Sequence, residues 1–359
     1  MRRRFVAAGL LLVCCLVMRV AFARFGAALF PGWRVASKGL VTLQATVASV
    51  VPVAIWDIAL ALGIVASIVF LVRNRKKRDA ILSWLSWVCL AGSTMAVLFV
   101  FWAFNHYAPP LAHDLGLEVR AYSTDELADA MQYYLDRAAQ MAPEVSRESD
   151  GGLAHQDFFE LARIAGSAYG SVAGSYEVFR GPQLPVKALL LWGEPLLYSG
   201  HTGIFWAPTG ESGVPLNCPD ADLPFIMCHE AAHRLGIADE GEANFAAFLA
   251  CEASQDERLA YSGYFNAFSY CFSALYGADP DRAVALVNEA AEGELGQGVY
   301  LLFSDRAATR ERYDSFRGPF QEVGTAVNDT YLKSFGESSG VRSYGLVVDY
   351  LIAWYQASA

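Results

Sequence analysis

Charged residues are scarce in this chain: they account for 18% of its 359 residues, whereas hydrophobic residues account for 54%. Soluble globular domains have about 25% charged residues, so the composition argues against a purely soluble protein. Aromatic residues, at 13%, are too frequent for a disordered chain. The chain also lacks a surplus of basic charge, because it contains 27 Lys and Arg residues and 37 Asp and Glu residues. We therefore expect no nucleic-acid partner.

The shortage of acidic residues is confined to the first part of the chain. Residues 1–104 contain 12 Lys and Arg and only 2 Asp and Glu, a net charge of +10, whereas residues 105–359 contain 15 and 35, a net charge of −20. This change of sign predicts two domains. We predict a membrane anchor in residues 1–104 and a separate acidic domain in residues 105–359.

Three apolar stretches of the anchor predict transmembrane helices, at about residues 5–22, 50–72 and 80–104. A helix needs roughly 20 mostly apolar residues to cross the hydrocarbon core, and the second and third stretches meet that length. The first stretch is marginal. It fits either an uncleaved span, which we favour, or a signal peptide cleaved near Ala21–Ala23.

Basic clusters set the predicted orientation, because Lys and Arg beside a span stay in the cytoplasm. They lie at Arg2–Arg4 and Arg73–Arg78, so we expect a multi-pass protein of the cell membrane with a cytoplasmic N-terminus and extracytoplasmic residues 105–359. An amphipathic piece near Lys38–Ala48 lies between the first two spans. Asp57 fits an interfacial residue near the outer end of its span better than an intramembrane ion or proton group. Trp102 fits the aromatic belt of the third span.

The outer domain is predicted to be mainly helical (α+β) with a small β-hairpin or sheet. Asn105–Leu117 contains two adjacent prolines and predicts an extended lead-in. Val186–Trp192 and Thr202–Pro208 have strand character, and the Gly- and Pro-rich segment Gly193–Asp222 predicts loops and a hairpin. Helices are predicted at about 123–141, 157–169, 224–235, 240–254, most of 260–333, and 343–355, the last with an apolar face of Leu346, Tyr350 and Trp354.

One uncharged segment of this domain has two interpretations. Leu259–Ala278 contains no charged residue and would be long enough for a fourth span. Its Ser, Asn and Tyr residues favour a buried, aromatic-rich core helix instead.

Only six histidines are present, and two of them, His229 and His233, stand four residues apart. On a helix this spacing places both imidazoles on one face, where they can bind a single metal ion. Glu230 follows the first histidine and can reach a water on that ion as a general base. This H-E-x-x-H pattern is typical of zinc hydrolases and predicts one Zn²⁺ ion; the alternative is two surface or capping histidines.

Two acids compete for the role of third metal ligand. Glu240 and Asn244 are i,i+4 neighbours on the next predicted helix, so Glu240 can bind the ion while Asn244 bonds the free nitrogen of a ligating histidine. Glu242 points to a different face and is the alternative ligand. We prefer Glu240. Asp239 is the predicted N-cap of this helix.

The pattern His-Glu-x-x-His followed by Glu-x-Glu-Ala-Asn resembles the gluzincin metallopeptidases, whose third ligand is a Glu with Asp or Asn four residues later. Nearly the whole chain also resembles a bacterial membrane-protein family known as domain of unknown function 3810. The motifs that carry this second resemblance are Asn105-x-x-Ala-Pro-Pro-Leu, Tyr198-x-Gly-x-Thr-Gly-Ile, Leu223-Pro-Phe, Tyr261-Ser-Gly-Tyr and Ser343-Tyr-Gly-Leu-Val-Val-Asp. The resemblance implies a membrane-anchored zincin-like domain.

These observations predict a membrane-anchored zinc metallopeptidase that cleaves a peptide or protein substrate, with Glu230 as general base. Tyr198, His201 and Tyr344 are candidate donors to the oxyanion or the substrate, and one of the two predicted strands would align the substrate. The alternative is a non-catalytic zinc-binding membrane sensor or scaffold. An intramembrane protease is disfavoured because charged residues surround the motif.

Cysteine usage leaves two alternatives for the outer domain. Its four cysteines are Cys218, Cys228, Cys251 and Cys271. An even number outside the cytoplasm fits disulfides, and buried free thiols fit equally well.

Overall fold

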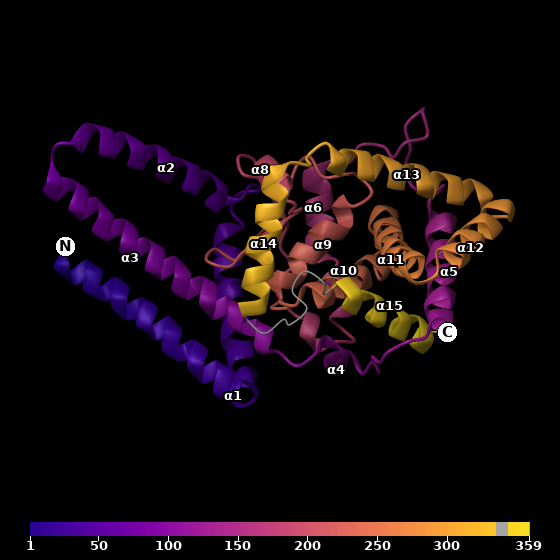
Figure 1. Ribbon diagram of the computed structural model, residues 1–359, viewed down its shortest axis with the longest axis horizontal. Coiled ribbons are helices and arrows are strands. Elements are labelled where there is room, and N and C mark those ends of the chain that lie inside the picture. Colours follow the sequence, from indigo (N-terminus) through magenta and orange to yellow (C-terminus); the bar gives the residue numbers. More distant parts are fainter. Residues whose placement is uncertain (335–343, 359) are drawn as a thin grey trace.

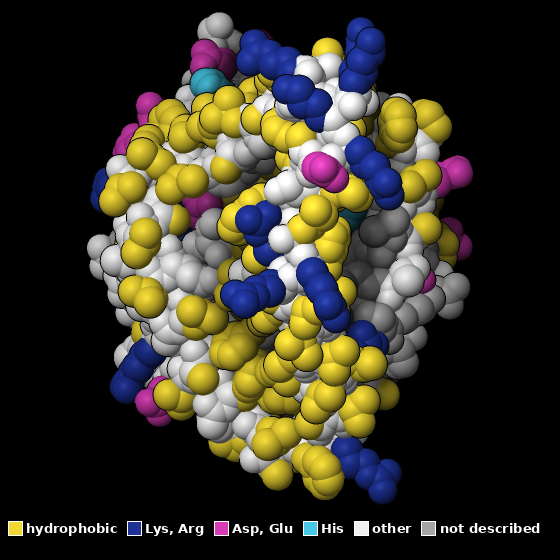
Figure 2. All heavy atoms as spheres, turned by 90° about the vertical axis from the view of Figure 1, so that its left-hand side faces the viewer, with side chains coloured by type: hydrophobic (Ala, Val, Ile, Leu, Met, Phe, Trp, Pro, Cys, Tyr) yellow, Lys and Arg dark blue, Asp and Glu magenta, His cyan; other side chains and the backbone are white. Residues whose placement is uncertain are grey.

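The computed structural model describes residues 1–334 and 344–358, which are mostly helical with one small sheet. Helices α1 (Arg2–Ala48), α2 (Ile55–Asn74) and α3 (Arg78–Ala103) extend away from a helical domain formed by the rest of the chain (Figure 1). All three are long and apolar enough to cross a membrane. Seen from the anchor end, the molecule shows many hydrophobic side chains, and its charged side chains there are mainly Lys and Arg (Figure 2). These features indicate a membrane protein.

Helix α1 is longer than the predicted first span because the chain stays helical beyond it, with a bend at Phe25 (φ −132°, ψ 20°). The part after the bend contains the predicted amphipathic piece and is fastened to the helical domain. Lys38 Nζ donates to the Val178 carbonyl at 2.5 Å, and Gln44 Nε2 donates to the Pro208 carbonyl at 2.9 Å. This half of α1 therefore joins the anchor to the domain.

Asp57 makes a second connection between anchor and domain, from the first turn of α2. Its buried carboxylate accepts hydrogen bonds from the backbone N–H groups of Leu190, Leu191 and Trp192, at 2.9, 3.0 and 2.8 Å. The bonds give this charge a structural role.

We expect Asp57→Ala to destabilise the full chain by about 3 kcal/mol, because hydrogen bonds to a charged group are strong and three N–H groups would lose their acceptor. The thermal unfolding midpoint in detergent measures this change. Asp79→Ala is the matched control, since Asp79 is exposed but also lies in the first turn of its helix. Equal unfolding midpoints for the Asp57→Ala and Asp79→Ala variants would contradict the structural role of Asp57.

The sheet has the order β1-β3-β2, with β1 (Lys187–Leu189) parallel and β2 (Ile204–Trp206) antiparallel to β3 (Glu211–Pro215). The two predicted strand segments contain β1 and β2, and β2 and β3 form the predicted hairpin. The prediction of loops across residues 193–222 was wrong for helix α8 (Gly193–Tyr198). Its six residues begin with Gly-Glu-Pro, which has the composition of a turn.

The predicted extended lead-in at 105–117 was also wrong. It contains most of the 3₁₀ helix Phe104–Tyr107 and all of α4 (Leu111–Leu115). Proline is compatible with the first positions of a helix, and Pro110 is the N-cap of α4, so the proline pair here precedes a helix.

Most predicted helices of the domain are present, and α5 (Thr124–Met141) begins with the expected capping box of Ser123 and Glu126. The uncharged segment Leu259–Ala278 forms most of α11 (Glu257–Ala278), which packs against α5 with much of its surface buried, and this confirms a core helix. The last helix buries Val347, Tyr350 and Leu351. Leu346 is exposed, so the prediction that it belongs to the buried apolar face was wrong. The remaining helices are α6 (Phe158–Ser167), α7 (Tyr169–Val172), the 3₁₀ helix Glu177–Phe179, α9 (Leu223–Arg234), α10 (Glu240–Glu252), α12 (Pro280–Glu292), α13 (Gly296–Asp314), α14 (Pro319–Ser334) and α15 (Tyr344–Ser358).

All four cysteines of the domain are buried free thiols. Of the two alternatives, disulfides or buried free thiols, the structure therefore has free thiols at Cys218, Cys228, Cys251 and Cys271.

Candidate metal centre

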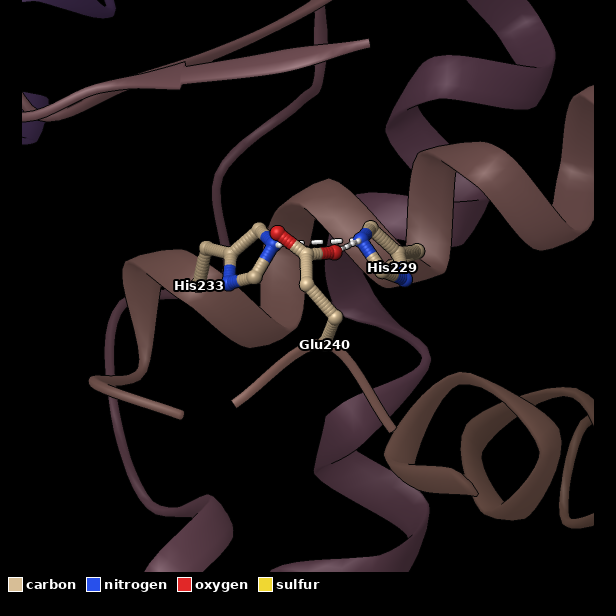
Figure 3. A group of neighbouring side chains, drawn as sticks. All are labelled: His229, His233 and Glu240. Carbon is tan, nitrogen blue, oxygen red and sulfur yellow. Dashed lines mark hydrogen bonds and ion pairs between the residues drawn. The ribbon is translucent and has the colours of Figure 1, made fainter. Parts of the chain in front are cut away.

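Helices α9 and α10 and the turn between them build the centre. Helix α9 carries His229 and His233 and ends before Gly236, whose φ of +88° allows the chain to reverse. Asp239 then caps α10, and its side chain accepts a hydrogen bond from the Glu242 N–H at 2.9 Å. Because the turn is short, the first residue of α10, Glu240, faces the histidines of α9 (Figure 3).

The ligand atoms of the three residues lie close together. His229 Nε2 is 3.1 Å from His233 Nε2 and 3.2 Å from Glu240 Oε2, and His233 Nε2 is 3.8 Å from the same oxygen. In a tetrahedral zinc site with bonds of about 2.0–2.1 Å, ligand atoms lie about 3.3 Å apart. The spacing therefore fits a small metal ion.

The second nitrogen of each imidazole is held by an oxygen atom. His229 Nδ1 lies 2.8 Å from Asn244 Oδ1, and His233 Nδ1 lies 2.7 Å from the Ile237 carbonyl. Both oxygens accept, so each Nδ1 carries a proton, and in the neutral imidazole Nε2 presents a lone pair. Two lone pairs and a carboxylate oxygen converge, and only a cation, either a proton or a metal ion, can bring them together favourably.

The electrostatics follow from this convergence. Partial burial raises the pKa of the Glu240 carboxyl, but hydrogen bonds from His229 and His233 outweigh burial and hold that pKa well below its usual range. Burial lowers the pKa of His233, while the bond to Glu240 reverses this and raises it to about 9. The centre thus already stabilises a positive charge between these groups.

Glu230 lies beside the histidines and is almost fully buried. Burial raises the pKa of its carboxyl to about 7, and its Oε2 has no hydrogen-bond partner among the described residues. Gly203, just before β2, approaches so closely that a Cβ there would lie 2.4 Å from Glu230 Oε1. A side chain at position 203 would displace this carboxylate.

The other predicted site residues occupy different surroundings. Burial lowers the pKa of His201, an effect that the charge of Glu240 partly offsets, and His201 Nδ1 is 3.0 Å from Ser199 Oγ. The exposed Tyr198 packs its ring against Phe316. The side chain of Tyr344 lies outside the described residues.

Glu242, the alternative ligand, does not join the histidines. Its carboxylate accepts hydrogen bonds from the Leu111 N–H at 2.7 Å and the Tyr350 hydroxyl at 2.9 Å. Burial raises its pKa to about 7. These contacts tie α10 to α4 and α15.

Trp102, at the end of α3, has a role that the sequence did not predict. Its indole N–H donates to the His233 carbonyl at 3.1 Å, and its ring meets the His233 imidazole edge-on, with 5.9 Å between centroids. A tryptophan at a span end is typical of an aromatic belt, so the sequence contained no further signal. The anchor therefore touches the candidate metal centre directly.

Fold and site together define a helical membrane protein with a His-His-Glu group on two successive helices. The family model described as "Protein of unknown function (DUF3810)" matches residues 35–352, which is most of the chain. The chain belongs to this family. The match includes the part of α1 that docks on the domain, the candidate spans α2 and α3, and all residues of the centre. No curated protein and no solved structure matches the chain.

Proposed function

We propose that the protein is a membrane-anchored, zinc-dependent metallopeptidase whose helical domain lies outside the cytoplasm. One observation carries the proposal: two histidine Nε2 atoms and the Glu240 carboxylate converge while buried Glu230 stands beside them. Basic residues at Arg2–Arg4 and Arg73–Arg78 support the proposed orientation.

The donor set suits zinc, which favours imidazole and carboxylate ligands in tetrahedral sites. A zinc ion held by His229, His233 and Glu240 would keep one position open for water, lower the pKa of that water to about 7 and polarise a carbonyl group. Asn244 and the Ile237 carbonyl would keep both imidazoles oriented.

The protein's own residues would carry out the proton transfers and stabilise the oxyanion. Glu230 accepts a proton as the water oxygen attacks the scissile carbonyl carbon, and it returns this proton to the amine when the C–N bond breaks. Burial favours the protonated form of Glu230, which helps its carboxylate to take the proton from water. His201 remains the proposed oxyanion donor, because the charge of Glu240 acts on its imidazole, whereas Tyr198 is exposed and packs on Phe316.

A non-catalytic sensor or scaffold is the second candidate, and the Trp102–His233 contact favours it. Through this contact a change in the anchor could alter the metal centre, or the reverse. The two functions differ in whether hydrolysis depends on Glu230.

Metal removal tests the proposed function. Treating the detergent-solubilised full chain with a chelator is expected to reduce cleavage of a denatured protein pool by at least about 100-fold, and one equivalent of zinc should restore it. Magnesium is the control, because it prefers octahedral oxygen sites. Unchanged cleavage by protein that metal analysis shows to be zinc-free would contradict the proposal.

A further inference from the structure

Strand β2 forms the free edge of the sheet. On the opposite side, the chain before α2 covers β1, since the Ala54 N–H donates to the Ala188 carbonyl at 3.0 Å. Among the described residues β2 pairs with β3 alone. An extended peptide can add to such an edge through backbone hydrogen bonds.

This edge lies between the domain-side ends of two spans. Trp206 stacks on Trp56 in the first turn of α2, with centroids 4.7 Å apart, while Phe205 contacts Trp102 in the last turn of α3 at 5.1 Å. Successive residues of a strand point to opposite faces. The two spans therefore flank β2 on its two faces.

The same strand begins at the proposed catalytic base. Gly203 precedes β2 and abuts Glu230, and Trp102 links the Phe205 side of the strand to the His233 carbonyl. A peptide paired with β2 would thus lie beside the ends of the two spans and at the same time reach Glu230 and the metal ligands.

The surroundings of the edge suit a membrane surface. Trp56 and Trp102 lie at span ends, where aromatic belts form, although both rings are buried against the domain. Leu190 and Leu191 are 48% and 51% exposed, although Asp57 at the end of α2 holds their backbone N–H groups. Exposed apolar side chains at a span end favour contact with the interfacial region of the bilayer.

We propose that the substrate is an extended segment presented at the membrane surface, the juxtamembrane stretch of a membrane-anchored polypeptide, which pairs with β2. This inference rests on the proposed peptidase function. The three residues of β2 offer few backbone hydrogen bonds to a free peptide. A membrane tether raises the local concentration of substrate and compensates for this weakness.

The test uses the full chain in lipid nanodiscs, in which both membrane faces are accessible. A mixed-sequence library of ten-residue peptides is offered free, or coupled to a diacyl lipid through a Gly/Ser spacer of five or of forty residues. Five residues reach at most about 17 Å, whereas forty span about 35 Å on average. Both tethered libraries have the same surface density, so the long spacer controls for concentration at the membrane.

We expect the short-spacer library to be cleaved at least about tenfold faster than the long-spacer library, and faster still than the free one. Equal rates for the two spacers, or a free library cleaved as fast, would overturn the membrane-surface substrate while leaving the peptidase function intact. If no library is cleaved faster by the protein than by its Glu230→Gln variant, the peptidase function fails and the inference fails with it.

Discussion

Replacing Glu230 by Gln is expected to reduce peptide hydrolysis by about 10²–10⁴-fold, the usual contribution of a general acid–base group. Gln has nearly the same shape but can neither take the proton from water nor return it to the amine. Glu230 is not part of the converging ligand set, so zinc content should stay the same. Cleavage rate and metal stoichiometry, measured on one preparation of the full chain, separate the two effects.

Glu194→Gln is the matched control, because it makes the same chemical change at an exposed position of α8. It should retain full activity. Hydrolysis that continues unchanged in the Glu230→Gln protein would show that this carboxylate is not the base. Loss of zinc in that variant would show instead that Glu230 helps to hold the metal.

Replacing Glu240 by Ala should lower the bound zinc from about one equivalent to nearly none. Glu240 supplies the only anionic donor of the group, and without it two neutral imidazoles remain. Replacing a residue that only hydrogen-bonds to a metal ligand weakens metal binding by about 10–100-fold. Removing a ligand itself should therefore have a larger effect. Metal analysis after dialysis measures it.

Glu242→Ala is the comparison variant. It tests whether Glu240 is the metal ligand and Glu242, two positions later, has a structural role only. Glu242→Ala removes the acceptor of the Leu111 and Tyr350 hydrogen bonds and should lower the unfolding midpoint while zinc is retained. The reverse pattern, with zinc lost only on replacing Glu242, would refute the assignment of Glu240.

These experiments use the full chain because the centre and the anchor are in contact. Trp102 bonds the carbonyl of His233, and Asn105 Nδ2 donates to Ser37 Oγ at 3.0 Å beside the turn at Gly236. A separately expressed helical domain would lack Trp102 and part of this packing. Inactivity of such a fragment would not distinguish an inactive site from a disturbed one.

The sequence alone predicted what depends on residues close together in the chain. Hydrophobic length indicated the candidate spans, Ser123 and Glu126 indicated the start of α5, and spacings of four residues related His229 to His233 and Glu240 to Asn244. These patterns repeat with the period of a helix, so they do not require knowledge of the tertiary fold.

Only the tertiary structure decided the contacts between distant segments. The bond from Trp102 to His233, the three bonds from residues 190–192 to Asp57 and the approach of Gly203 to Glu230 join parts of the chain that local periodicity does not relate. Trp102 and Asp57 had the sequence features of ordinary interfacial residues. Their partners depend on how the domain packs on the anchor, and that packing arises from many weak long-range contacts, which no short motif encodes.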